Sequence, residues 1–175
     1  MNSRDRQTVS NILGRRSIRR FEERPVEKEK VSLILECAFA APSAGNARPT
    51  HVVVVDERST LNGLAEALPY GKMLSKAPLA FVVCADPSGS DIARQYWEED
   101  CAAAMENILL AVHALGLCGV WLGVHYAPER VHAVRNLLKI PDDVEVLGIA
   151  ATGYPAEKKD PHGGIPEGKI HVNRW

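Results

Sequence analysis

The sequence lacks the common signatures of several site types. Its four cysteines form no Cys-x-x-Cys pair and have no zinc-like spacing to histidine. No Gly-x-Gly-x-x-Gly occurs, so a standing Rossmann-type dinucleotide site is not expected. No Ser-His-Asp or Cys-His arrangement appears in a motif context, and we therefore name no catalytic side chain.

The sequence also lacks an excess of charge of either sign, because its formal net charge is −1 over 175 residues. There is no global basic field and no aromatic interleaving, so nucleic acid is not an expected partner. Residues 107–128 carry no Asp, Glu, Lys or Arg, but glycines and a helix stop interrupt them. We interpret them as a buried helix followed by a buried strand, not a membrane span.

No apolar stretch follows the early charges, so no secretory signal is expected. Each cysteine lies in an apolar segment, which favours small core residues in a reducing compartment. We therefore predict a cytoplasmic protein in which all four thiols are core residues, namely Cys37, Cys84, Cys101 and Cys118.

A short basic segment, residues 14–21, stands out against this neutral background. Arginine presents a planar fork of donors that matches phosphate oxygens, and the serine adds a neutral donor. In extended chain Ser17 and Arg19 face the same way and could converge on one anion. The alternative is a solvated basic patch.

Hydrophobic periodicity predicts one α+β domain over residues 1–175, with helices around a single sheet. The β-branched run 51–55 suggests a central strand buried on both faces. The tail 155–175 has too little apolar periodicity to fold alone, and we expect it to pack on a partner subunit. The expected helices are 5–13, 27–39, 91–115 and 128–138, with weak helical pieces at 61–68 and 72–76; the expected strands are 51–55, 79–84, 119–124 and 144–151.

In their order along the chain, the motifs resemble those of the FMN-dependent nitroreductase family, in its compact branch. The motifs are Arg15-Arg16-Ser17-Ile18-Arg19, Ala41-Pro42-Ser43-Ala44-Gly45-Asn46, Pro69-Tyr70-Gly71-Lys72-Met73-Leu74, Trp97 to Asp100, Gly119-Val120-Trp121-Leu122-Gly123, Gly153-Tyr154-Pro155 and Asn173-Arg174-Trp175. The resemblance implies a three-layer sandwich with a central mixed sheet flanked by helices. It also implies a homodimer with two FMN molecules at its interface.

The resemblance further implies roles for particular residues. Arg15, Arg16, Ser17 and Arg19 would hold the FMN phosphate, completed by Arg174 or Lys169. The loop residues Pro42, Ser43, Ala44 and Asn46 would reach the partner's flavin ring, and Leu122 and Gly123 would lie beside the ring of their own subunit. The alternatives are that Asn46 caps a turn, Gly123 marks a strand bend and Arg174 is a surface charge.

Two departures from the family pattern concern single residues. Family members often have glutamine and tryptophan around the proline after the loop, where this chain has Arg48-Pro49-Thr50. Arg48 either favours an anionic reactant or is a solvated rim charge. His125 follows the glycine-flanked strand, and it either donates a proton at the site mouth or packs in a turn.

The expected activity is electron transfer from NADH or NADPH through the flavin to a small acceptor such as a nitroaromatic, quinone or enone. The nicotinamide would stack transiently and leave before the acceptor enters, so the flavin would be the catalyst. Alternatives are an FMN-binding sensor, storage or delivery protein, an arginine-based module for nucleic acid or an acidic partner, and specialised branches that remove halogens or degrade flavin.

Overall fold

The computed structural model describes residues 3–161 and 163–175. The four strands and the two long C-terminal helices begin and end within two residues of their predicted limits. In chain order the elements are α1 (Ser3–Gly14), α2 (Lys28–Phe39), η1 (Ala44–Asn46), β1 (Thr50–Val55), α3 (Arg58–Ala67), η2 (Lys72–Ser75), β2 (Leu79–Ala85), η3 (Pro87–Gly89), α4 (Asp91–Ala114), β3 (Cys118–Gly123), α5 (Pro128–Leu138) and β4 (Glu145–Gly153).

The strands form one sheet in the order β1-β2-β4-β3, and every neighbouring pair is antiparallel. The expectation of a mixed sheet is thus wrong for these four strands, because β4 runs opposite to both strands that flank it. In the part of the chain that the structure describes, the parallel pairing is a single bridge between Ser17 and Gly119, outside the named strands.

Strand β1 lies at an edge of the sheet, which corrects the prediction that it is central. His51 and Val54 are exposed, the other residues before Val55 are partly buried, and only Val55 is fully buried. A run of valines predicts extended backbone, but it does not predict whether the strand is central or at an edge of the sheet.

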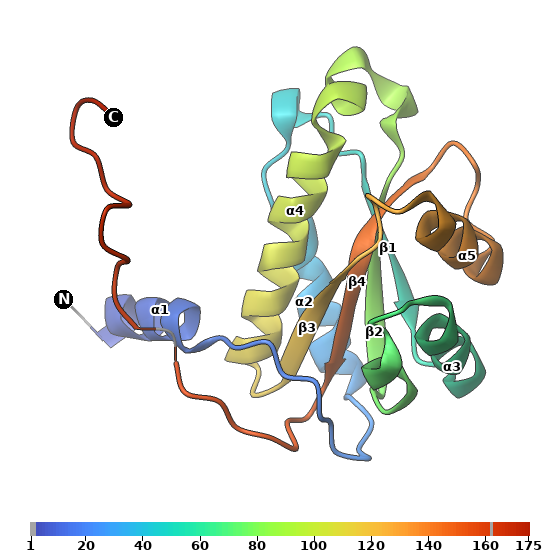
Figure 1. The fold of residues 1–175 in the computed structure, drawn as a ribbon, viewed down its shortest axis with the longest axis horizontal. Helices are drawn as coiled ribbons and strands as arrows, with labels where there is room; N and C mark the ends of the chain where they lie inside the picture. Colours follow the sequence, from blue (N-terminus) through green and yellow to red (C-terminus); the bar gives the residue numbers. More distant parts are fainter. Residues whose placement is uncertain (1–2, 162) are drawn as a thin grey trace.

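Helices cover both faces of the sheet, as Figure 1 shows, with α2 and α4 on one side and α3 and α5 on the other. Each interface has its own apolar cluster, because successive strand residues point to opposite faces. Ile149 packs with Leu61 and Val134 on one face, and Ala150 packs with Ile34 and Ile108 on the other. The α+β fold and its three layers are therefore confirmed.

Helix α4 is the long central element of its layer. Ser90 caps its N-terminus by accepting a hydrogen bond from the Ala93 amide (3.1 Å). No Gly or Pro interrupts the helix, and ten of its residues are buried, including Asp100.

Helix α1 and the end of the C-terminal tail lie on the same side of the molecule, apart from the sheet (Figure 1). Helix α1 is held against α4, where the Asn11 amide donates to the Leu110 carbonyl (3.0 Å). Cys84, Cys101 and Cys118 are buried as predicted, but Cys37 on α2 is exposed, since it lies on the side of the helix away from the core. Among the described residues no helix is long and apolar enough to cross a membrane.

Candidate functional site

The motif Arg15-Arg16-Ser17-Ile18-Arg19, which we call the arginine–serine segment, is extended chain that runs beside β3. Ser17 forms its parallel bridge with Gly119, and the Ile18 amide donates to the Gly119 carbonyl (3.1 Å). Because Ile18 is buried, it anchors the segment while its neighbours face outward.

Residues from the start of the tail hold the other side of this segment. The Arg19 amide donates to Glu157 Oε1 (2.7 Å), and Lys159 Nζ donates to the Ser17 carbonyl (2.7 Å). Arg16 donates to the Asp160 carbonyl. This hydrogen bond from the Arg19 amide is the main cause that lowers the pKa of Glu157 below its ordinary value. The backbone of the segment is therefore fixed by long-range contacts.

Beside this segment lies a cavity of about 630 Å³, a size that suits one small-molecule ligand. We call it the cationic cavity, because three lining residues are cations and none is an acid. Its lining residues are Arg19, Leu68, Pro69, Tyr70, Lys72, Met73, Trp121, Leu122, Gly123 and Arg130. The structure thus brings Arg19 together with Leu122 and Gly123 at one cavity.

Gly123 leaves open space on the cavity side. A Cβ built on it would meet no atom within 4 Å, and its φ is not positive. A flat ring could therefore approach the backbone here, at a place that a side chain would fill. With apolar walls and several cations around it, this space fits a planar anionic cofactor such as FMN.

Sequence reasoning did not assign Lys72 and Arg130 to the site. Lys72 lies in the quoted segment Pro69 to Leu74, so its position in a motif was the available signal. Arg130 gave no signal, because a charge in the first turn of an amphipathic helix ordinarily faces solvent.

The loop of residues 42–48, the 42–48 loop, lies away from the cationic cavity and helps to line a smaller one of about 130 Å³. The Ala44 amide donates to Asp100 Oδ1 (2.8 Å), and the Arg48 amide donates to Ser43 Oγ (3.0 Å). Asn46 Oδ1 accepts from Arg48 Nε (2.9 Å). Within one chain Pro42, Ser43, Ala44 and Asn46 therefore do not join the other predicted site residues.

Other residues singled out from the sequence also lie outside the cationic cavity, among them Arg15, Arg16 and Ser17. Lys169 and Arg174 are exposed on the extended tail. His125 Nε2 lies 3.0 Å from Glu98 Oε1, and its ring packs edge-on against Trp97 with centroids 4.5 Å apart. This geometry favours the packed-turn interpretation of His125.

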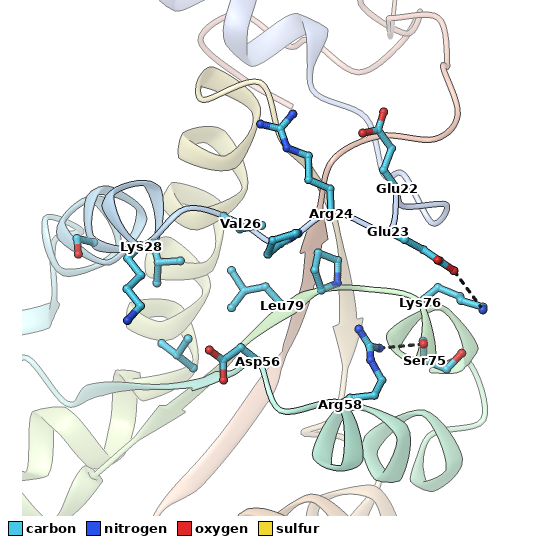
Figure 2. Close-up of a pocket in the computed structure, with 15 residues that line it drawn as sticks. Glu22, Glu23, Arg24, Val26, Lys28, Asp56, Arg58, Ser75, Lys76 and Leu79 are labelled. Carbon is cyan, nitrogen blue, oxygen red and sulfur yellow. Dashed lines mark hydrogen bonds and ion pairs between the residues drawn. The ribbon is translucent and has the colours of Figure 1, made fainter.

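A larger cavity of about 770 Å³ opens where the chain enters α2 (Figure 2). Its charges are of both signs, and some are already satisfied within the chain. Arg58 donates to the Ser75 carbonyl (2.9 Å), and Lys76 Nζ lies 3.9 Å from Glu23 Oε1. It contains none of the predicted site residues, so the cationic cavity is the better candidate.

Comparison with known proteins finds relatives that are similar to this chain in sequence and in fold. A protein of Archaeoglobus fulgidus named "Putative NADH dehydrogenase/NAD(P)H nitroreductase" is 43% identical over 167 residues, 94% of this chain and 96% of its own. A crystal structure from Parabacteroides distasonis with the same name has a TM-score of 0.92 at 39% identity, covering 97% and 99% of the two chains. An FMN-dependent nitroreductase of Clostridium difficile has a TM-score of 0.89 at 32% identity, covering 95% and 99%.

The family model points the same way as the fold and the cavity. The model of the Nitroreductase family matches residues 12–69 and 64–154, which include the arginine–serine segment, the 42–48 loop and the glycine-flanked strand. The chain therefore belongs to the Nitroreductase family.

Proposed function

We propose that this protein is an FMN-dependent oxidoreductase that passes electrons from NADH or NADPH to a small acceptor such as a nitroaromatic, quinone or enone. The observation that carries the proposal is the cationic cavity beside the arginine–serine segment. The names of the Archaeoglobus and Clostridium relatives, which include NAD(P)H and FMN, support it.

The residues of this chain would bind and position the cofactor. Arg15, Arg16 and Ser17 hold the phosphate, whose nearly two negative charges need several cationic donors. Gly123 lets the ring approach the backbone, and Arg19 and Lys72 supply positive charge in the cavity where the ring lies. Bound FMN supplies the hydride and electron chemistry, which the positive charge around it tunes.

The remaining predicted residues belong to a homodimer in this proposal. The 42–48 loop reaches the partner's flavin, and the tail 155–175 packs on the partner and brings Lys169 or Arg174 to a phosphate. Exposed apolar side chains on α1, α2 and the tail support such an interface, because monomers rarely expose them together. They include Ile12, Leu13, Leu33, Phe39, Ile170 and Trp175. The four cysteines of the protein are unpaired, which suits the reducing cytoplasm, and we propose that the protein resides there.

The first experiment is the visible spectrum of the purified protein, with the released chromophore identified by mass. We expect a flavin spectrum with FMN near one per chain. A colourless protein that takes up no added FMN would contradict the proposal.

A second experiment separates an enzyme from an FMN-binding sensor, storage or delivery protein. Steady-state oxidation of NADH and NADPH is measured with a panel of nitroaromatics, quinones and enones, with free FMN as control. We expect acceptor-dependent turnover, and its absence across the panel would favour the binding protein.

A further inference from the structure

Arg130 is a cation of the cationic cavity that the proposed FMN site does not use. It comes from the first turn of α5, separate from the arginine–serine segment and from η2. Its Nε is buried and has no hydrogen-bond partner among the residues that the structure describes. Glu129 Oε1 lies 4.0 Å from this atom, too far for a hydrogen bond. The side chain as a whole is 30% exposed and lines the cavity, so the guanidinium is not saturated by the protein and can donate to a ligand there.

Tyr70 lies next to this guanidinium at the cavity wall. Arg130 Cζ is 6.0 Å from the centroid of the Tyr70 ring, at the limit of a cation–π contact. The Tyr70 side chain is 76% exposed, which is unusual for an aromatic residue beside a cavity. The pair thus offers a planar face and a charged fork side by side.

The surroundings of the pair favour negative charge. Arg19 and Lys72 line the same cavity, and no Asp or Glu is among its lining residues. The N-cap of α5 is Ala127, which supplies no side-chain cap, so the positive end of the helix dipole adds to the charge of Arg130, and Glu129 in the same turn offsets part of it. An anionic group here would gain a charge-assisted, two-pronged hydrogen bond.

We infer that Arg130 and Tyr70 form a subsite for the anionic group of a planar reactant that binds beside the flavin. The inference rests on the proposed function and specifies the reactant class. The anion is either a carboxylate on an aromatic acceptor or a phosphate of the nicotinamide donor. In both cases Arg130 determines specificity, while electron transfer stays with the flavin.

Equilibrium binding tests the subsite without turnover. Benzoate and its neutral analogue benzamide are titrated calorimetrically into the FMN-loaded protein. We expect benzoate to bind about tenfold more tightly, with the preference lost in Arg130→Gln and partly kept in Arg130→Lys, which retains the charge without the fork. Arg94→Gln removes an exposed arginine of α4 and serves as the charge-matched control.

Kinetics then identify the source of the anion. With 4-nitrobenzoate and 4-nitrobenzamide as acceptors, an acceptor subsite predicts that Arg130→Gln lowers kcat/KM about tenfold for the nitrobenzoate alone. A donor subsite predicts instead a similar rise in the KM for NADH or NADPH. If wild type and Arg130→Gln agree in both arms and benzoate shows no preference, the subsite is refuted. A protein that retains FMN and turnover in that case separates this failure from failure of the proposed function.

Discussion

At the scale of single residues, the arginine–serine segment carries the strongest prediction. Replacing either Arg16 or Arg19 with alanine should cost about 2–4 kcal/mol of FMN binding free energy, because each would pair with a desolvated phosphate or ring. Fluorescence titration of the stripped protein with FMN measures this, with Arg94→Ala as control. Wild-type affinity in both variants would refute the assignment.

Replacement by alanine should have different effects at two paired glycines, Gly123 on β3 and Gly148 on β4. At Gly148 a Cβ would lie 2.6 Å from the Leu122 carbonyl oxygen and from Trp121 Nε1, so Gly148→Ala should destabilise the fold by about 1–3 kcal/mol. At Gly123 the space is open, so Gly123→Ala should keep the melting temperature of the FMN-free protein. Its methyl group would occupy the place of the ring and weaken FMN binding on the order of tenfold.

Measuring melting temperature and FMN affinity on both variants separates packing from binding. If Gly123→Ala binds FMN normally, the ring does not approach this strand, and the strand-bend interpretation of Gly123 is correct.

At the scale of elements, the sequence predicted most of the fold, because periodicity is a local property. Helix α4 was predictable from three- and four-residue apolar steps, and the arginine–serine segment was predicted as extended chain. The edge position of β1 and the exposure of Cys37 were not, since both depend on which distant elements pack alongside. Arg130 joins the cationic cavity only because α5 packs beside α3, and no local pattern predicts that packing.

Glu27, just before α2, forms a hydrogen bond with Tyr154, which directly follows β4, and the strength of this bond depends on pH. The Tyr154 hydroxyl donates to Glu27 Oε2 (2.7 Å) and itself accepts from Lys30 Nζ (2.8 Å). The hydrogen bond from the Tyr154 hydroxyl is the main cause that lowers the pKa of Glu27 from 4.5 to about 2, and Lys30 and Arg24 lower it further. The folded state therefore holds the carboxylate ionised at a pH where the unfolded chain is already protonated.

The sign of the pH effect follows from this difference. Glu27 contributes its full stabilisation above about pH 4.5, and the contribution disappears as the pH falls toward about 2. In Glu27→Gln the free energy of unfolding should decline less steeply over this window. Urea unfolding at several pH values measures the slopes, and Tyr154→Phe, which keeps the ring beneath Arg24, should show the same flattening. Equal slopes in all three proteins would contradict the assignment.

At the scale of the whole molecule, the proposed site is incomplete within one chain. The 42–48 loop and the distal tail lie away from the cationic cavity, yet the start of the tail is bound to the arginine–serine segment through Glu157, Lys159 and Asp160. In the proposed dimer the tail therefore divides by function. Residues up to 160 would support the segment of their own subunit, and the rest of the tail would contact the partner.

Deleting residues 161–175 should therefore weaken the homodimer and FMN binding together, while contacts to the arginine–serine segment remain. In the full-length chain, Lys169→Ala combined with Arg174→Ala should lower FMN affinity and leave the dimer intact, because it removes charge but retains the apolar side chains Ile170 and Trp175. Sedimentation velocity and FMN titration on both proteins measure the two effects separately. A truncated protein that stays dimeric with full FMN affinity would show that the tail serves neither role. A wild-type monomer with full FMN occupancy would overturn the homodimer itself, because one chain would then complete the pocket alone.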